Sequence, residues 1–474
     1  MQMFTQTQGL VILAVYALML YAVIWSFSRG FRFSKLNFLV AGREIGKIPA
    51  AFSIAATWIW APSLFVSSEK AYTQGWVGLF WFLVPNISCL ILFSFFAKKI
   101  RSLFPDGFTL SGYMKERYSK RVHFVYLFAL TGLATCSFAV QLLAGGQIIS
   151  TISGLPYVTV TIILALIPVG YSLYSGLRAS IISDFVQMVV ILLVGLGVVL
   201  GAVYASGGIE TVWKGLNGKT GTYTDLFSGD GLNVFYTFGI PVTIGLLSGP
   251  FGDQSFWQRA FSIKRKVVQP AFVIAAFVFG VVPLTLSVLG FIAAGTGINI
   301  KNTSQVNMEV VANFLPGWVI VPFVYLLLSG LVSTLDSNLS AISSLAGHDI
   351  LERKKGDSAN RRDVLRYSKG SMLILVVGGI AIANIPGLTI LYLFLFYGTL
   401  RSSTLLPTII TLLKKDVSEV GMFWGIITSL SVGLPIFAYG NLHKVVPMVI
   451  GGSLFTVLAS GVIVLVVSFA VRKK

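Results

Sequence analysis

The chain has 474 residues, of which 55% are hydrophobic and only 11% are charged, and its formal net charge is +18. Soluble globular proteins carry about 25% charged residues, so this composition excludes an ordinary soluble domain. Apolar runs of about 20 residues recur from end to end, and each could cross a hydrocarbon layer of roughly 30 Å as a helix. We therefore expect an all-α membrane protein.

Thirteen apolar runs are long enough to be transmembrane helices. They are approximately Gln8–Phe27, Ile48–Tyr72, Gly75–Ala97, His123–Thr151, Pro156–Leu173, Leu177–Val203, Val234–Phe256, Val267–Ala294, Gly317–Leu345, Gly370–Ile385, Leu388–Leu412, Val420–Tyr439 and Val445–Val471. The sequence thus predicts about 13 transmembrane helices joined by short connections.

The basic residues concentrate in alternate connections between these spans. Residues 29–47, 98–121 and 353–369 are rich in Lys and Arg, and the chain ends on Arg472-Lys473-Lys474, whereas the opposite connections hold only scattered Lys. Cytoplasmic loops are enriched in basic residues. This distribution predicts an N-terminus outside and a C-terminus inside. It also assigns the positive charge to contact with anionic lipid rather than with nucleic acid.

Two of the predicted spans contain helix-breaking residues. Pro62 interrupts the second span, and Pro241 and Pro250 interrupt the seventh. A simple kink explains any single proline in a membrane helix. The pair indicates more, because residues 48–203 and 234–412 each hold five spans and each begin with a broken helix. Two halves of odd span number have opposite topology, as in transporters built from inverted repeats.

Three segments carry a resemblance to a known family: Ser175–Gln187, Asp253–Arg259 and Ser333–Ser337, the last followed by Leu345–Leu351. The chain resembles the sodium:solute symporters, whose fold is a LeuT-type 5+5 inverted-repeat core. Residues 58–61, with Ala71, Tyr72 and Gly75, are most similar to the urea-transporter branch. Arg401, inside the eleventh span, departs from the family pattern.

The resemblance implies one transporter domain over residues 1–474, with core repeats at 48–203 and 234–412. The expected function is a symporter, not an enzyme, that couples sodium entry to uptake of a small polar solute by alternating access. Urea, proline or another amino acid, a carboxylate and a sugar stay open as solutes. A proton-coupled transporter and a channel-like facilitator are the alternatives. The expected location is the plasma membrane, and the expected coupling ion is sodium.

A sodium site is implied at the first broken helix. Sodium is a hard cation and prefers oxygen ligands. The resemblance places the backbone carbonyls of Ala56, Ile59 and Gly330 and the hydroxyls of Ser333 and Thr334 around the ion. Serine and threonine in membrane helices also bond across helices without any ion, which is the structural alternative.

Asp184 and Asp336 are rare intramembrane acids and are therefore functional candidates. We predict that they form, with Ser337, a second cation site or a proton-linked carboxylate pair. The alternative is that each aspartate pairs separately with a basic group, such as Arg178 or Arg401.

Several residues could line a solute cavity: Trp58, Trp60, Ser248, Gly249, Phe251, Tyr397 and Arg401. Arg401 could bind an anionic group of the solute through its fork of donors. A structural role, in which it locks Asp336, is slightly favoured. Asp253, Gln258 and Arg259 are interpreted as a cytoplasmic gate or a structural network.

Overall fold

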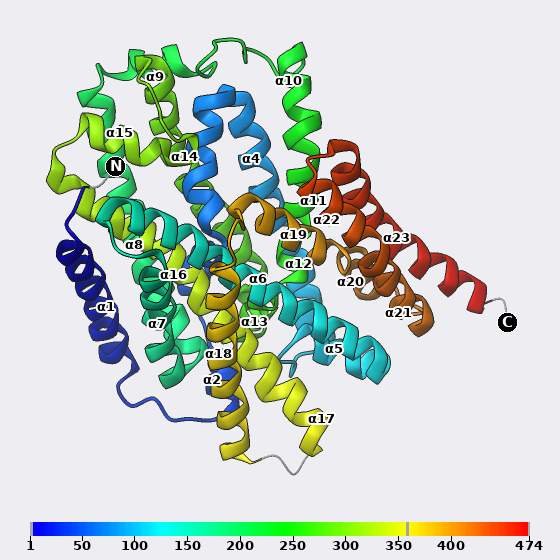
Figure 1. Cartoon of the computed structure of the whole chain (residues 1–474). Coiled ribbons are helices and arrows are strands. Elements are labelled where there is room, and N and C mark those ends of the chain that lie inside the picture. The colour runs from blue at the N-terminus through cyan, green and yellow to red at the C-terminus, as the bar shows by residue number, and fades with distance from the viewer. Residues whose placement is uncertain (1–2, 357–359, 473–474) are drawn as a thin grey trace.

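The computed structural model describes residues 3–356 and 360–472, and its helices run mostly along one long axis (Figure 1). Eleven helical stretches in this part of the chain are long and apolar enough to cross a membrane. The all-α fold predicted from the sequence is confirmed. The span count differs from thirteen for two reasons: the helix Ala61–Leu103 includes the end of the second predicted span and the whole third span, and the eleventh is divided between Ile390–Ser402 and Leu405–Leu413. Lys473 and Lys474 of the predicted basic tail lie outside the described residues.

The helices are given in chain order. They are α1 (Gln6–Ser28), α2 (Lys35–Val40), α3 (Lys47–Trp58), α4 (Ala61–Leu103), α5 (Leu110–Arg117), α6 (Lys120–Ser153), α7 (Tyr157–Ser175), α8 (Leu177–Ala205), α9 (Ile209–Gly215), α10 (Gly229–Val234), α11 (Ile240–Leu247), α12 (Gly249–Gly252), α13 (Gln254–Ser262), α14 (Val268–Thr296), α15 (Val306–Phe314), α16 (Ile320–Ser344), α17 (Leu351–Lys355), α18 (Arg361–Ala383), α19 (Ile390–Ser402), α20 (Leu405–Leu413), α21 (Glu419–Thr428), α22 (Leu434–Leu442) and α23 (Val446–Arg472).

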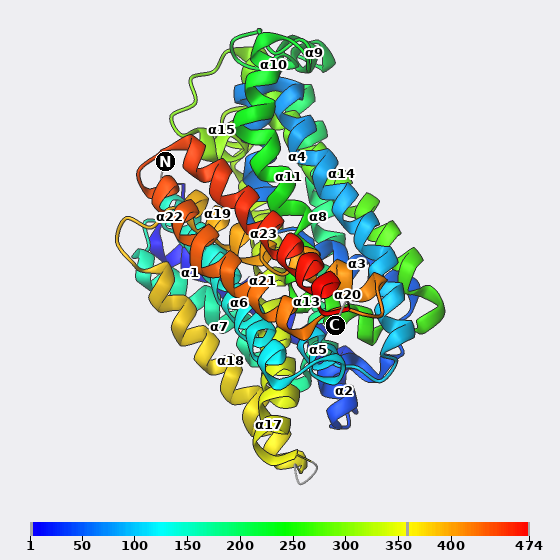
Figure 2. The ribbon, with the colours of Figure 1, turned by 90° about the vertical axis from the view of Figure 1, so that its right-hand side faces the viewer.

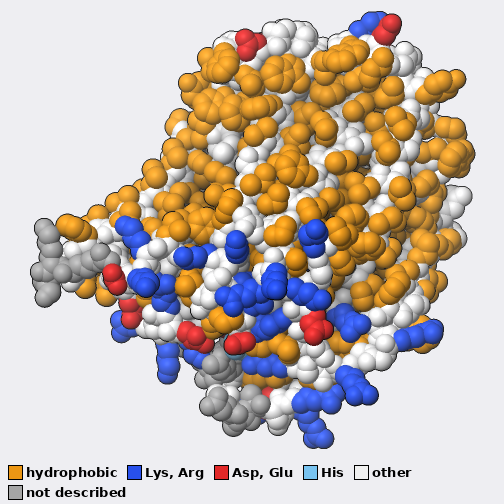
Figure 3. Space-filling model, turned by 180° about the vertical axis from the view of Figure 1, so that it is seen from behind, with side chains coloured by type: hydrophobic (Ala, Val, Ile, Leu, Met, Phe, Trp, Pro, Cys, Tyr) orange, Lys and Arg blue, Asp and Glu red, His pale blue; other side chains and the backbone are white. Residues whose placement is uncertain are grey.

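The surface separates into an apolar region and a basic end. Figure 3 shows hydrophobic side chains over most of one face and Lys and Arg side chains gathered at its lower end. The short helices α2 and α17 lie at this end in Figure 1, whereas α9, α10 and α15 lie at the opposite end. Large apolar side chains such as Leu18, Phe128 and Leu193 are exposed on the spanning helices. An apolar surface of this extent requires lipid around it, so the chain is an integral membrane protein.

The first broken helix is α3 followed by α4. Ile59 and Trp60 are extended between them, and Pro62 lies in the first turn of α4. Proline has no backbone N–H, so Pro62 cannot continue the hydrogen-bond ladder from α3. The hydroxyl of Ser63 donates instead to the carbonyl of Trp58 at 3.4 Å. The chain turns again at Gly75, whose φ of +58° favours glycine, and returns along the second part of α4.

The second broken helix is the series α11, α12 and α13. Pro250 lies in the first turn of α12, and Asp253 is extended and caps α13. Ile45, just before α3, pairs with Ile263, just after α13. The first broken helix therefore begins where the second ends, so the two run in opposite directions.

Helix α16 holds the centre of the molecule. It packs against α8, α6, α7 and α3, and almost all of its residues from Phe323 onward are buried. The terminal helices α21 to α23 lie on the outside of the assembly and pack mainly on one another, on α6 and on α19 and α20 (Figure 2). Helix α16 also contacts α3, α4 and α13, so it lies beside both broken helices.

Candidate functional site

Five oxygen atoms meet where the α3–α4 break faces α16. The hydroxyl of Ser333 donates to the carbonyls of Ala56 and Gly330, both at 3.0 Å. The hydroxyl of Thr334 donates to the carbonyls of Ile59 at 3.2 Å and Gly330 at 3.3 Å. The structure thus brings together all five residues of the predicted sodium site. The carbonyl of Ile59 is available because the backbone N–H of Ser63, which a continuous helix would direct to it, bonds to Trp60.

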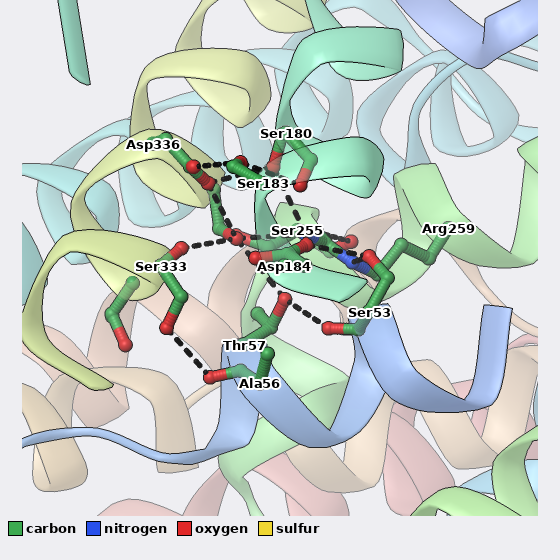
Figure 4. Close-up of polar contacts among 12 residues, drawn as sticks. Ser53, Ala56, Thr57, Ser180, Ser183, Asp184, Ser255, Arg259, Ser333 and Asp336 are labelled. Carbon is green, nitrogen blue, oxygen red and sulfur yellow. Dashed lines mark hydrogen bonds and ion pairs between the residues drawn. The ribbon is translucent and has the colours of Figure 1, made fainter. Parts of the chain in front are cut away.

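A buried ion pair lies next to these oxygens (Figure 4). Nη2 of Arg259, on α13, is 2.7 Å from Oδ2 of Asp184, on α8. The same nitrogen donates to Ser337 at 2.7 Å and to Ser180 at 3.3 Å, while Nε donates to Ser53 at 2.9 Å. Charges buried in a low-dielectric interior require such partners. The other carboxylate oxygen of Asp184 is buried and has no hydrogen-bond partner among the described residues.

Asp336 has a different environment, made of hydroxyl groups. Its carboxylate accepts hydrogen bonds from Tyr171 at 2.8 Å, Ser180 at 2.7 Å and Ser183 at 2.6 Å. The side chain is fully buried, and within the described part of the chain it forms no ion pair. Ser180 connects the two acids, because its hydroxyl also accepts a hydrogen bond from Arg259. Asp184, Asp336 and Ser337 therefore lie in one hydrogen-bond network, and their role as a cation or proton site stays a prediction.

Separate pairing with a basic group holds for Asp184 but not for Asp336, and both example partners from the sequence are wrong. Asp184 pairs with Arg259 rather than with Arg178, and Asp336 bonds to hydroxyls rather than to Arg401. The predicted boundary explains the first error. The seventh span was placed as ending at Phe256, which left Arg259 in a basic loop, whereas α13 continues to Ser262 and Arg259 is 1% exposed.

A small cavity separates the two broken helices and α16. Its volume is only about 10 Å³, so its walls lie close together. Its walls combine aromatic rings, hydroxyls and one charge of each sign. The lining residues are Thr57, Trp58, Trp60, Ser137, Asp253, Ser255, Phe256, Thr334, Ser337, Asn338, Tyr397 and Arg401. This cavity touches the five-oxygen cluster through Thr334, whose hydroxyl bonds to Ile59.

The residues proposed for the solute cavity separate into two groups. Trp58, Trp60, Tyr397 and Arg401 line the cavity. The residues of the second group lie around α12, outside that lining: Ser248, Gly249 and Phe251. Ser248 bonds to Ser402 on α19 at 2.8 Å, and Phe251 is fully buried among aromatic rings of α4 and α13. A Cβ added at Gly249 would collide with the Trp58 ring, so this glycine permits the close packing of that tryptophan.

Other polar residues of the site were not selected from the sequence. Ser53, Thr57, Tyr171, Ser180 and Ser183 all contact the carboxylates or their immediate partners. Ser180 lies one helical turn before both Ser183 and Asp184 on α8, and Ser53 and Thr57 lie one turn apart on α3. This spacing of small polar residues along one face was a readable signal. The sequence does not show which helix each of these polar faces contacts.

The chain is similar to known proteins over most of its length. A family model described as the sodium:solute symporter family matches residues 38–429. The urea-proton symporter DUR3 of Oryza sativa subsp. japonica is 23% identical over 95% of this chain and 68% of its own length. The urea active transporter of Saccharomyces cerevisiae is 24% identical over 81% of this chain, which spans 56% of that relative. The sodium/pantothenate symporter of Haemophilus influenzae is 25% identical over 88% of both chains.

A solved structure shares the fold over nearly the whole chain. The substrate-bound, outward-open state of a Na⁺-coupled sialic acid symporter matches with a TM-score of 0.81 at 16% identity. The match covers 98% of this chain and 97% of that one. At this identity the match establishes the LeuT-type architecture.

Proposed function

This chain belongs to the sodium:solute symporter family, and we propose that it is a secondary active symporter that couples sodium entry to uptake of a small polar solute. Its family and its relatives are transporters rather than enzymes. The relatives carry out urea, pantothenate and proline transport, as their names state. Urea is the first solute to test here, since several of the relatives found are urea transporters.

One observation carries the proposal: the convergence of the five oxygens of Ala56, Ile59, Gly330, Ser333 and Thr334. Carbonyl and hydroxyl oxygens are the ligands that a hard cation prefers. Three of them are backbone carbonyls, and the broken helix holds two of those three toward α16. A sodium ion among these oxygens would replace the weak hydroxyl–carbonyl hydrogen bonds with stronger ion contacts and tie the α3–α4 break to α16.

Coupling follows from the shared position of Thr334. Its hydroxyl belongs to the oxygen cluster, and the same residue lines the solute cavity. We propose that sodium orders the wall against which the solute binds, so that each ligand raises the affinity for the other. Alternating access would then rock one helix bundle against the other around this site.

The proposed setting is the plasma membrane, with the N-terminus outside and the C-terminus cytoplasmic. The basic end of the molecule in Figure 3 supports this orientation, because cytoplasmic loops are enriched in Lys and Arg. The other proposed partners are the solute, sodium and the bilayer, and no nucleic acid.

The test is thermal stability of the purified protein in sodium, with potassium as the ionic control. A ligand that binds only the folded state raises the melting temperature by mass action. We expect a sodium-specific rise in the wild type and its loss in Ser333→Ala. A wild type that melts at the same temperature in both salts would refute the sodium site.

A second candidate is proton coupling, which Asp336 supports. A buried carboxyl surrounded by hydroxyls, with no ion-pair partner among the described residues, can exist in its neutral form. One relative is a urea-proton symporter by name. In this case uptake would follow a pH gradient in the absence of sodium.

A further inference from the structure

The solute cavity contains one positive and one negative side chain, Arg401 on α19 and Asp253 before α13. Both side chains line the same cavity, and among the described residues the structure records no ion pair between them. Opposite charges that share a small cavity without pairing are costly, because each loses hydration and gains little in return. Each charge therefore remains available to a third group placed between them.

Arg401 has unused hydrogen-bond donors. Its side chain is 3% exposed, and its only hydrogen bond among the described residues runs from Nε to the carbonyl of Gly245 at 2.8 Å. Nη2 is buried and has no hydrogen-bond partner there. The guanidinium lies 5.8, 5.9 and 5.1 Å from the ring centres of Trp58, Trp60 and Tyr397. These rings hold the cation in place and leave its free edge as a donor for an acceptor atom of a solute.

The cavity wall also contains hydrogen-bond acceptors. One oxygen of Asp253 accepts a hydrogen bond from the backbone of Ser255, and the residue retains partial exposure. Oδ1 of Asn338 is buried and has no hydrogen-bond partner in the described structure, while its Nδ2 donates to Ser137 and Thr334. Unmet buried acceptors favour a solute with N–H groups.

We propose that Arg401 and Asp253 are the specificity-determining residues of the solute site and select a small, planar, uncharged amide or urea-type compound. This inference rests on the proposed function. The carbonyl oxygen of the solute would accept from Arg401, and its N–H groups would donate to Asp253 and Asn338. A simple carboxylate has no N–H group, and its charge would be repelled by Asp253. The flat ring faces of Trp58 and Trp60 suit a planar group.

Acetamide and acetate make a direct test, because they have nearly the same shape but differ in charge and in N–H groups. Binding of urea, acetamide, acetate and glycine to the purified full-length protein would be measured by calorimetry in sodium. We expect urea and acetamide to bind the wild type at least about tenfold more tightly than acetate, a difference of about 1.4 kcal/mol. Acetate or glycine binding as tightly as acetamide would overturn the proposal.

Asp253→Asn gives a sharper test, because asparagine can still cap α13 while the cavity gains one positive charge. The preference for acetamide over acetate should fall at least about tenfold in this variant, through tighter acetate binding. Asp230→Asn is the matched control, since Asp230 is exposed in the first turn of α10. This variant should prefer acetamide over acetate as strongly as the wild type does. An unchanged preference in Asp253→Asn would refute the assignment.

Arg401→Gln should abolish binding of both amides while the sodium-induced rise in melting temperature persists, which shows that the variant is folded. Loss of that rise together with binding would instead make Arg401 a structural residue and overturn its role in specificity. A wild type that responds to sodium but binds neither urea nor acetamide would refute this inference and leave the symporter proposal standing. Absence of the sodium response as well would refute both.

Discussion

Nη2 of Arg259 lies 2.7 Å from Oδ2 of Asp184, and the two side chains are 1% and 0% exposed. The pair joins α13, the inner part of the second broken helix, to α8. Ser53 on α3 completes it by donating to the carboxylate at 2.6 Å and accepting from Nε of the arginine. A single charge pair therefore connects both broken helices to a helix of the surrounding bundle.

Removal of Arg259 should destabilise the protein strongly. Arg259→Gln leaves the carboxylate of Asp184 buried without a counter-ion, and such a loss costs about 3–5 kcal/mol. We expect a lower midpoint of thermal unfolding in detergent. The double variant Arg259→Gln/Asp184→Asn should recover part of the loss, since no net charge then remains buried.

The exposed ion pair between Lys355 and Asp363 is the matched control. Its atoms are 2.8 Å apart, and the Lys355 side chain is 44% exposed. Solvent screens such a pair, so Lys355→Gln should change the unfolding midpoint far less than Arg259→Gln. Equal effects of the two substitutions would show that burial of the Arg259 pair is not what stabilises it.

Thr334 should affect both ligands. Thr334→Val removes one of the five oxygens with little change in volume, so sodium affinity should fall at least about tenfold, which corresponds to about 1.4 kcal/mol. Because Thr334 also lines the cavity, solute affinity measured in sodium should fall with it. Titrations of melting temperature with sodium, and of solute binding at fixed sodium, check the two effects.

Thr334→Ser keeps the hydroxyl and should behave nearly as the wild type in both titrations. If the valine and serine variants bound sodium equally well, the hydroxyl of Thr334 would not be a ligand.

Asp336 should control the cation dependence of uptake. Asp336→Asn keeps the shape of the side chain and removes its negative charge from the network of Tyr171, Ser180 and Ser183. We expect the stimulation of uptake by sodium or by a proton gradient to fall by about fivefold or more, because linked sites typically change each other's affinity by at least about that factor. Uptake into proteoliposomes with each gradient applied separately makes the measurement.

If Asp336→Asn retained the wild-type response to both gradients, Asp336 would take no part in coupling. Tyr171→Phe removes one donor and keeps the acid, so it should weaken the response less than Asp336→Asn does.

Gly249 should not tolerate a side chain. A Cβ at this position would overlap the ring of Trp58, which lines the solute cavity. Overpacking of this kind costs about 1–3 kcal/mol, and displacement of Trp58 should also lower solute affinity. Thermal unfolding and solute binding of Gly249→Ala test both effects.

Gly245→Ala serves as the control, because a Cβ on Gly245 meets no atom within 4 Å and alanine favours the helix. Its stability should equal or exceed that of the wild type. A harmless Gly249→Ala would mean that Trp58 can move without cost.

The helical spans and the basic end of the molecule were readable from the sequence because they depend on local properties. Run length decides whether a segment can cross a bilayer, and proline breaks a helix wherever it stands in the interior. The prolines at 62 and 250 therefore marked the breaks. The oxygen set around Ser333 and Thr334 came from the family resemblance, and the structure brings those five residues together.

The pairing of charges could not be read from the sequence, because it depends on helices that are far apart in the chain. Arg259 and Asp184 are separated by 75 positions, and the predicted end of the seventh span at Phe256 leaves Arg259 in a basic loop although it is buried. The surroundings of Arg401 could not be predicted from the sequence for the same reason. Local sequence marked it as unusual, but only the packing of α19 against both breaks places its guanidinium opposite Asp253 and away from Asp336. The sequence by itself determined the helices and their breaks through short-range chemistry. The tertiary structure decided which polar groups meet, because each buried charge takes the partner that helix packing brings within hydrogen-bonding distance.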